Sequence, residues 1–181
     1  MSIVLTLLLL LGLLGGIVWC MRRGFVRTLI SIGILFLSTL FAALLYNPLI
    51  SLFTANLGNP NSGRTAGAIV FAGLMIVFVV ALEALVHRNY PGLRSGKPSM
   101  LNNVLAAIFG VIWSIYVISL VLLILEFGSL SIGGSLTVVS DVIHQTGLVR
   151  VFRAFFIVPM VPIKLLFQGR VPEVLVYFPL Q

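Results

Sequence analysis

Three arginines stand between two apolar runs that are each long enough to cross a membrane. The runs are residues 3–21 and 28–46, and the basic turn between them reads Arg22-Arg23-Gly24-Phe25-Val26-Arg27. A helix needs about 20 apolar residues to span the hydrocarbon core of a bilayer. The pattern therefore predicts a transmembrane hairpin whose two helices are joined by a tight, positively charged turn.

The composition extends this prediction to the whole chain. Apolar residues make up 60% of the 181 residues and charged residues only 8%. A soluble domain carries about 25% charged residues, so this chain lacks the charge to cover a water-facing surface. We expect an all-α membrane protein with four transmembrane helices, at about residues 3–21, 27–46, 65–87 and 103–125. They form a predicted transmembrane domain over residues 1–126.

Residues 127–181 follow a different pattern and are predicted to form amphipathic or interfacial helices. Segment 148–167 is apolar, but the basic residues at its two ends leave only residues 154–163 uncharged between them. This stretch is too short to cross a bilayer, and Pro159 and Pro162 are expected to interrupt a helix there. We therefore expect an interfacial tail, with a fifth span as the alternative.

The net charge of +7 would suggest nucleic acid as the partner of a soluble protein. Here the basic residues lie close to the ends of apolar runs, where positive charge fixes topology and meets anionic lipid head groups. We therefore expect the lipid bilayer as a partner and no nucleic acid. Basic loops face the cytoplasm, so both termini are predicted to lie outside it. The residues in the two basic loops are Arg22, Arg23, Arg27, Arg88, Arg94 and Lys97.

Small residues recur at spacing four on three of the predicted spans. In lipid, a helix face lined by small residues lets a neighbouring backbone approach closely. We expect these positions to pack helix against helix, within this chain, in a homo-oligomer or against other membrane subunits. The positions are Gly12 and Gly16 in the first span, Gly63 and Gly67 at the third, and Ala106, Gly110 and Ser114 in the fourth.

Few residues are available for chemistry, since the chain holds four acidic residues and two histidines. Glu83 lies inside the third span, and an ionisable residue there is a functional candidate. It is one turn from His87, so we expect an ion pair or hydrogen bond with His87 or Arg88, with ion handling as the alternative. A lone His87 can ligate a haem or pigment metal, but no metal-binding motif accompanies it. We expect no cofactor, no metal site and no enzymatic activity.

The basic turn also carries a family resemblance. Arg23-Gly24-Phe25, followed by Arg27, resembles the Arg-Gly-Phe turn into the second span of the CvpA (colicin V production) family of bacterial inner-membrane proteins. The resemblance covers about residues 3–126. It implies a four-span protein of the bacterial inner membrane, linked to colicin V production or export, a toxin biosynthetic process, and to envelope maintenance.

The start of the fourth span matches the family only in part. The family shows a Leu-Asp-Arg-like start followed by two glycines, and this chain keeps Leu101 and Gly110. Asn102 stands in place of the acid, Asn103 in place of the base, and Ala106 in place of the first glycine. The resemblance therefore implies a divergent member that lacks the acid of the family pattern.

Three functions remain open from the sequence. The resemblance favours a scaffold or an export-linked or envelope-linked factor of the plasma membrane without catalytic activity. The small-residue faces and the apolar tail favour an accessory structural subunit of a larger bioenergetic or photosynthetic membrane complex. Glu83 inside a span leaves a channel or transporter component as a further alternative.

Overall fold

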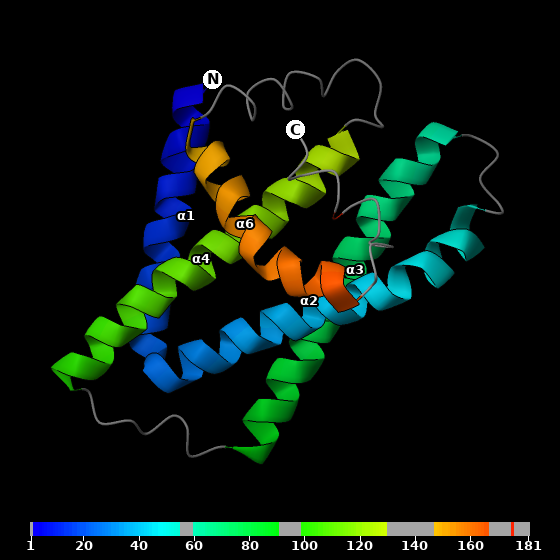
Figure 1. Ribbon diagram of the computed structural model, residues 1–181. Helices are drawn as coiled ribbons and strands as arrows, with labels where there is room; N and C mark the ends of the chain where they lie inside the picture. The colour runs from blue at the N-terminus through cyan, green and yellow to red at the C-terminus, as the bar shows by residue number, and fades with distance from the viewer. Residues whose placement is uncertain (1, 55–59, 91–98, 130–146, 167–174, 176–181) are drawn as a thin grey trace.

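The computed structural model describes residues 2–54, 60–90, 99–129, 147–166 and 175. These residues contain helices and no strand, which confirms the all-α prediction. Figure 1 shows the elements in chain order. They are α1 (Ser2–Arg23), α2 (Phe25–Thr54), α3 (Pro60–Asn89), α4 (Met100–Ser129) and α6 (Gly147–Leu166).

Four of these helices are long and apolar enough to cross a membrane, as the sequence predicts. The apolar segments are Ile3–Arg23, Phe25–Leu52, Ala66–Asn89 and Met100–Glu126. Each exceeds the roughly 20 residues that a span requires. The chain is therefore built as a four-span helical bundle.

α2 is longer than the sequence predicts, because it continues through Pro48 to Thr54. Proline removes one backbone N–H and crowds the carbonyl four residues earlier, which is why we expected the span to end there. Packing compensates for this loss. Tyr46 is buried with its ring centroid 6.3 Å from that of Phe71 on α3, and Ile50 packs against the same core. Tertiary contacts on both sides of the proline thus keep the backbone helical.

The Asn, Gly and Pro residues between the second and third predicted spans lead us to expect a loop over residues 48–64, and the observed connection is shorter. Residues 48–54 belong to α2, and α3 begins at Pro60. Proline is well tolerated in the first turn of a helix, where its missing N–H has no intrahelical acceptor. The central residues of the predicted loop, 55–59, lie outside the described residues.

α6 also contains the prolines that we expected to interrupt it. Pro159 and Pro162 both lie inside the helix. The helix buries Phe152, Phe156 and Ile163 on one face, at the spacing expected of an amphipathic helix. In Figure 1, α6 lies across α4, against which it packs. The predicted interruption is wrong because this buried face stabilises the helix on both sides of the prolines.

α4 is the central element of the bundle. It packs against α1, α2, α3 and α6, and α2 packs most extensively against α3. Within one 18-residue apolar window of each segment, 44% of the residues of α2 and α4 are buried, but only 11% of those of α1 and α3. α2 and α4 are therefore the inner helices, while α1 and α3 flank them and turn broad apolar faces outward.

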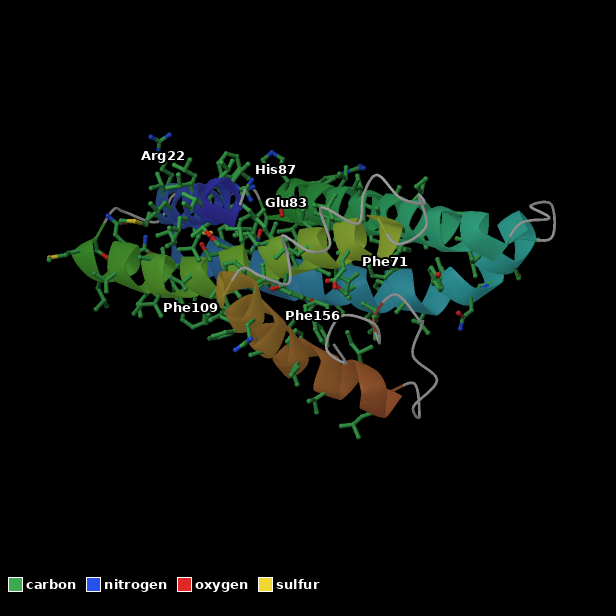
Figure 2. The ribbon with its side chains drawn as sticks, turned by 90° about the horizontal axis from the view of Figure 1, so that it is seen from above. Arg22, Phe71, Glu83, His87, Phe109 and Phe156 are labelled. Carbon is green, nitrogen blue, oxygen red and sulfur yellow. The ribbon has the colours of Figure 1, made fainter. Side chains whose placement is uncertain are left out.

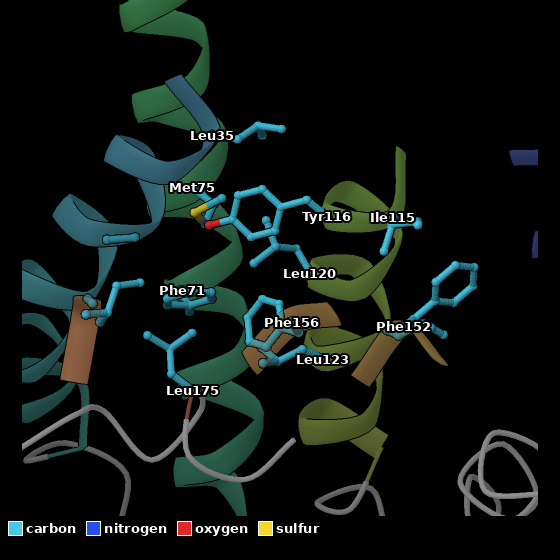
Figure 3. Close-up of a cluster of buried hydrophobic side chains, with 14 of the residues drawn as sticks. Leu35, Phe71, Met75, Ile115, Tyr116, Leu120, Leu123, Phe152, Phe156 and Leu175 are labelled. Atoms are coloured by element: carbon cyan, nitrogen blue, oxygen red, sulfur yellow. The ribbon is translucent and has the colours of Figure 1, made fainter. Parts of the chain in front are cut away.

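α6 contributes to the core and not only to the surface. Phe156 belongs to the same buried cluster as Phe71 of α3 and Leu123 of α4 (Figure 3). Ser119 of α4 donates a hydrogen bond of 3.1 Å to the carbonyl oxygen of Phe152, which anchors the helix at one position. The part of the C-terminal region that forms α6 is thus packed into the transmembrane bundle.

Candidate functional site

The end of α1, the start of α2, the end of α3 and the start of α4 meet at one end of the bundle (Figure 1). We call this the basic end, because Arg22, Arg23, Arg27 and Arg88 lie there. α1 ends at Arg23 and α2 begins at Phe25, so the turn is a single residue.

That residue, Gly24, has a φ of +86°. A residue with a Cβ atom is strained in this left-handed conformation, whereas glycine is not. The turn is further fixed by Thr28, whose Oγ1 donates to the carbonyl oxygen of Gly24 at 2.9 Å. The glycine of the Arg-Gly-Phe motif therefore permits a reversal that sets the arginines of α1 and α2 close together.

Asn102 of α4 also contacts the turn. The backbone N–H of Phe25 donates to Asn102 Oδ1 at 3.1 Å, so Asn102 caps the first turn of α2. A Cβ atom on Gly24 would lie 3.2 Å from Asn102 Nδ2. In the sequence, Asn102 stands out only as a departure from the family pattern. Its capping role joins residues 77 positions apart, so no local pattern reveals it.

An ion-pair cluster lies next to the turn. Glu83 Oε1 on α3 lies 2.7 Å from Arg23 Nη1 on α1 and 3.4 Å from Arg27 Nη2 on α2. Ser31 Oγ donates to the second carboxylate oxygen at 3.4 Å. The side chains of Arg23, Arg27 and Glu83 are 27%, 19% and 29% exposed, so water screens the pairs only in part. One carboxylate thereby connects three helices.

The partners of Glu83 differ from those expected from the sequence. Spacing along the third span indicated His87 or Arg88, which follow Glu83 on the same helix. The structure instead provides partners from α1 and α2, 60 and 56 residues away. His87 and Arg88 are both exposed. Helical spacing identifies neighbours on one helix, but it carries no information on which other helix faces Glu83.

The cluster forms one end of a cavity of about 510 Å³ between α2 and α3. Its polar lining consists of the three ion-pair residues, Ser31 and His87. Figure 2 shows Glu83 and His87 between the ends of α1 and α3. The remaining wall is apolar or aromatic and consists of Ile34, Leu35, Val79, Val80, Ala84 and Trp113. We refer to this space as the charged cavity.

The basic residues that were predicted to meet lipid head groups differ in their positions. Arg22 is exposed and points away from the bundle (Figure 2), and Arg88 is also exposed. Arg23 and Arg27 turn inward, and the guanidinium of Arg23 also lies 4.5 Å from the ring centroid of Trp19. Arg94 and Lys97 lie outside the described residues.

Close packing joins α1 to α4 beside the cavity. A Cβ atom on Gly16 would collide with the hydroxyl of Ser114, and one on Gly110 would lie 2.9 Å from Cys20 Cβ and 3.3 Å from Ile17 Cα. Ser114 turns its hydroxyl to the carbonyl oxygen of Gly110 at 2.7 Å. We call these five residues the α1–α4 seam. Cys20 is 2% exposed and acts as a packing residue there.

The other predicted packing residues make looser or less direct contacts. A Cβ atom on Gly12 would meet Ile118 Cδ1 at 3.7 Å, an ordinary contact. Ala106 is fully buried on α4, and Gly67 is buried on α3. Gly63 lies in the first turn of α3. Among the described residues, no three His, Cys, Asp or Glu side chains are grouped so that they could hold a metal ion.

Comparison with protein families places these features in a known context. The family model described as colicin V production protein matches residues 3–157. The chain belongs to the colicin V production protein family. The match contains all four apolar helices and reaches into α6, so the family region extends beyond the resemblance over residues 3–126. The comparisons with curated proteins and with solved structures found no match.

Membership in the colicin V production family confirms the resemblance seen in the Arg-Gly-Phe turn. Together with the four apolar helices it makes this chain a multi-pass membrane protein. In this family member the turn supplies both arginines of the ion-pair cluster, and Asn102 caps α2 at the position where the family shows an acid.

Proposed function

We propose that this protein is a non-catalytic scaffold of the bacterial inner membrane, linked to toxin export or envelope maintenance. The observation that carries the proposal is that polar groups at the basic end pair with one another across helices. Glu83 is held by Arg23 and Arg27, and this contact connects three helices. Such an arrangement supports a role in holding a bundle in one shape.

The hydroxyl groups nearby have comparable roles. Thr28 Oγ1 lies 2.9 Å from the carbonyl oxygen of Gly24 and 3.3 Å from that of Cys20. Ser114 donates to Gly110 within the α1–α4 seam. These side chains satisfy helix carbonyls, a common role of Ser and Thr in apolar helices. Their use as structural hydrogen bonds favours a structural role over a reaction.

A scaffold also needs surface for partners, and α1 and α3 supply it. Leu11 of α1 is 68% exposed and Ile76 of α3 is 64% exposed, each within a broad apolar face. These faces can contact lipid, a second copy or another membrane protein. The family's description as colicin V production protein supports a link to toxin production or export. Under this proposal the basic end faces the cytoplasm and both termini lie outside it.

Site-specific photo-cross-linking in native membranes tests the scaffold proposal. A photoreactive residue at position 11 or 76 is expected to trap a discrete membrane protein or a second copy of the chain. The matched control is position 9, because Leu9 lies on the same helix as Leu11 but is 6% exposed. It is expected to react within the chain. Lipid adducts alone from every outward position would reject the proposal.

A second candidate is an accessory structural subunit of a bioenergetic or photosynthetic complex. Three glycines favour it: Gly15 of α1, Gly33 of α2 and Gly73 of α3 have no atom within 4 Å of an added Cβ position. Small residues on an open face let a partner helix approach closely. Stoichiometric co-purification with redox or pigment subunits in mild detergent would support this candidate, and a pure small oligomer would reject it.

A further inference from the structure

We propose that the charged cavity binds a phosphate group, from either a phospholipid head group or free phosphate. This proposal goes beyond a scaffold role, because it assigns the cavity a ligand. It rests on the charge, the unused donors, the size and the position of the cavity.

The charged cavity carries an excess of positive charge. Arg23 and Arg27 carry two positive charges, and both face the single negative charge of Glu83. The cluster therefore retains one net positive charge inside a partly buried space. Partial burial lowers the effective dielectric constant and strengthens the attraction of a bound anion. A phosphate group with one or two negative charges matches this excess.

The two arginines of the cavity also have unused hydrogen-bond donors. A guanidinium has five N–H donors in a rigid fork that fits the oxygens of a phosphate. Among the described residues, Arg23 and Arg27 each donate one hydrogen bond, and both go to Glu83 Oε1. Because the two guanidiniums approach the same oxygen, they are close enough to hold one further oxyanion between them.

The contact of Arg27 is also the weaker one. Its Nη2 lies 3.4 Å from Glu83, compared with 2.7 Å for Arg23 Nη1. Charge-assisted hydrogen bonds are typically about 2.7–2.9 Å long, so Arg27 is incompletely satisfied by the carboxylate. His87 lines the same cavity and adds an imidazole N–H as a further donor.

The size and the position of the cavity also suit a phosphate group. The volume of about 510 Å³ lies within the range of roughly 300–1,000 Å³ that is usual for ligand pockets. The charged groups lie where the apolar helices end, which is the depth of lipid head groups in a bilayer. Leu35 and Val80 belong to the apolar wall and fit the glycerol and upper acyl chain of a lipid.

The chain contains its own reporter for binding. Its two tryptophans are Trp19 and Trp113. Trp19 lies against the guanidinium of Arg23, and Trp113 lines the charged cavity. A phosphate that draws Arg23 or Arg27 away from its present position is expected to change tryptophan fluorescence.

The experiment uses the full chain in micelles of dodecyl maltoside, a detergent without a phosphate group, and follows tryptophan fluorescence in two separate titrations. One adds short-chain phosphatidylglycerol, and the other adds inorganic phosphate. We expect a saturable change in at least one titration. Saturation by the lipid alone identifies a head group as the ligand source, and saturation by inorganic phosphate identifies free phosphate. No saturable change with either probe would overturn the proposal.

Two variants with opposite expectations separate a binding site from a purely structural ion pair. Arg27→Gln removes donors and is expected to weaken binding about tenfold, the usual effect of losing a charged hydrogen bond. Glu83→Gln removes the carboxylate that competes for both arginines and is expected to strengthen binding about tenfold. A purely structural pair gives no reason for the second variant to bind more tightly.

The matched control is Arg22→Gln. Arg22 belongs to the same turn and carries the same charge, but it is exposed and is not part of the cavity lining. We expect the affinity of the Arg22→Gln protein for the saturating probe to change less than about twofold, because salt screens the charge of an exposed residue. Equal weakening by Arg22→Gln and Arg27→Gln, or unchanged binding in folded Glu83→Gln protein, would overturn the proposal. If either charge-removing variant fails to fold, Arg27→Lys keeps the charge, loses the fork and is expected to weaken binding.

Discussion

On α1 the α1–α4 seam ends at Cys20, three residues before Arg23 of the charged cavity, yet the two regions use space in opposite ways. Cys20 faces the seam, where an added methyl on Gly110 has no room. Arg23 faces the cavity, where about 510 Å³ remains open. Small side chains let α1 and α4 approach closely at the seam, whereas long charged side chains line the open space of the cavity.

This difference indicates which region sets the fold and which is available for function. Apolar helices gain little from meeting each other in lipid, so close backbone contact and hydrogen bonding must hold them. The seam supplies such contacts. The cavity supplies charge and volume, which a ligand can use. Substitutions in the seam should therefore change mainly stability, and those in the cavity mainly binding.

The largest effect on stability is expected from Gly110→Val. The new side chain must displace Cys20 or the backbone of α1 at Ile17. We expect a loss of about 3 kcal/mol in the free energy of unfolding, at the upper end of overpacking effects, measured by denaturant titration in detergent. Maleimide labelling of Cys20, the single cysteine in the chain, should accelerate as the seam opens.

The matched control for the seam is Gly15→Val. Gly15 lies on α1 close to Gly16, but no atom lies within 4 Å of its added Cβ. Its unfolding free energy should change by less than about 0.5 kcal/mol, as for surface substitutions in general. Equal destabilisation by both variants would show that the seam is no tighter than the outward face of α1.

The seam also shows what the sequence could and could not predict. Spacing of four on each helix pointed to Gly16 and Gly110 as packing positions, because helical geometry alone puts such residues on one face. The length of the apolar runs predicted the four spans for a similar reason. Both predictions depend only on residues within the same helix.

The contacts of the charged cavity could not be predicted in this way. The pairs of Glu83 with Arg23 and Arg27 join residues 60 and 56 positions apart, and the cap from Asn102 joins residues 77 apart. Helical periodicity gives no information about contacts between residues so far apart in the sequence. The same limit explains Pro48, where contacts with α3 and the core override the local preference to end the helix.

The next effect in size is expected at the turn itself. Gly24→Ala forces a side chain into a backbone with φ of +86° and brings a Cβ to 3.2 Å from Asn102 Nδ2. The left-handed conformation costs about 1–2 kcal/mol for a residue with a Cβ atom, so we expect a loss of that size in denaturant titration. Gly33→Ala is the control, since nothing lies within 4 Å of its added Cβ. An unchanged unfolding free energy in Gly24→Ala would reject the role of glycine in the reversal.

Removal of the cap should have a smaller effect. Asn102→Ala leaves the N–H of Phe25 without its side-chain acceptor, and we expect a loss of about 1 kcal/mol in unfolding free energy. Asn102→Asp restores the acid of the family pattern and keeps an acceptor at the start of α2. It should be as stable as the natural chain to within about 0.5 kcal/mol. A loss in Asn102→Asp as large as that in Asn102→Ala would contradict the capping role.

The smallest effect on stability is expected from Glu83→Gln. The ion pairs are partly exposed, and such pairs contribute about 0–1 kcal/mol. We therefore expect a loss of less than about 1 kcal/mol, which shrinks further at high salt. The same variant should strengthen phosphate binding. A large loss of stability without a change in binding would assign the cluster to the fold and remove the distinction between the two regions.

The central claim is that the seam is packed for stability while the charged cavity is open for a phosphate group. A crystal structure of the chain grown with short-chain phosphatidylglycerol or inorganic phosphate tests it most directly. We predict phosphate density between Arg23 and Arg27, with the seam unchanged. Phosphate density only at exposed Arg22 and Arg88, with side chains filling the cavity, would contradict the account.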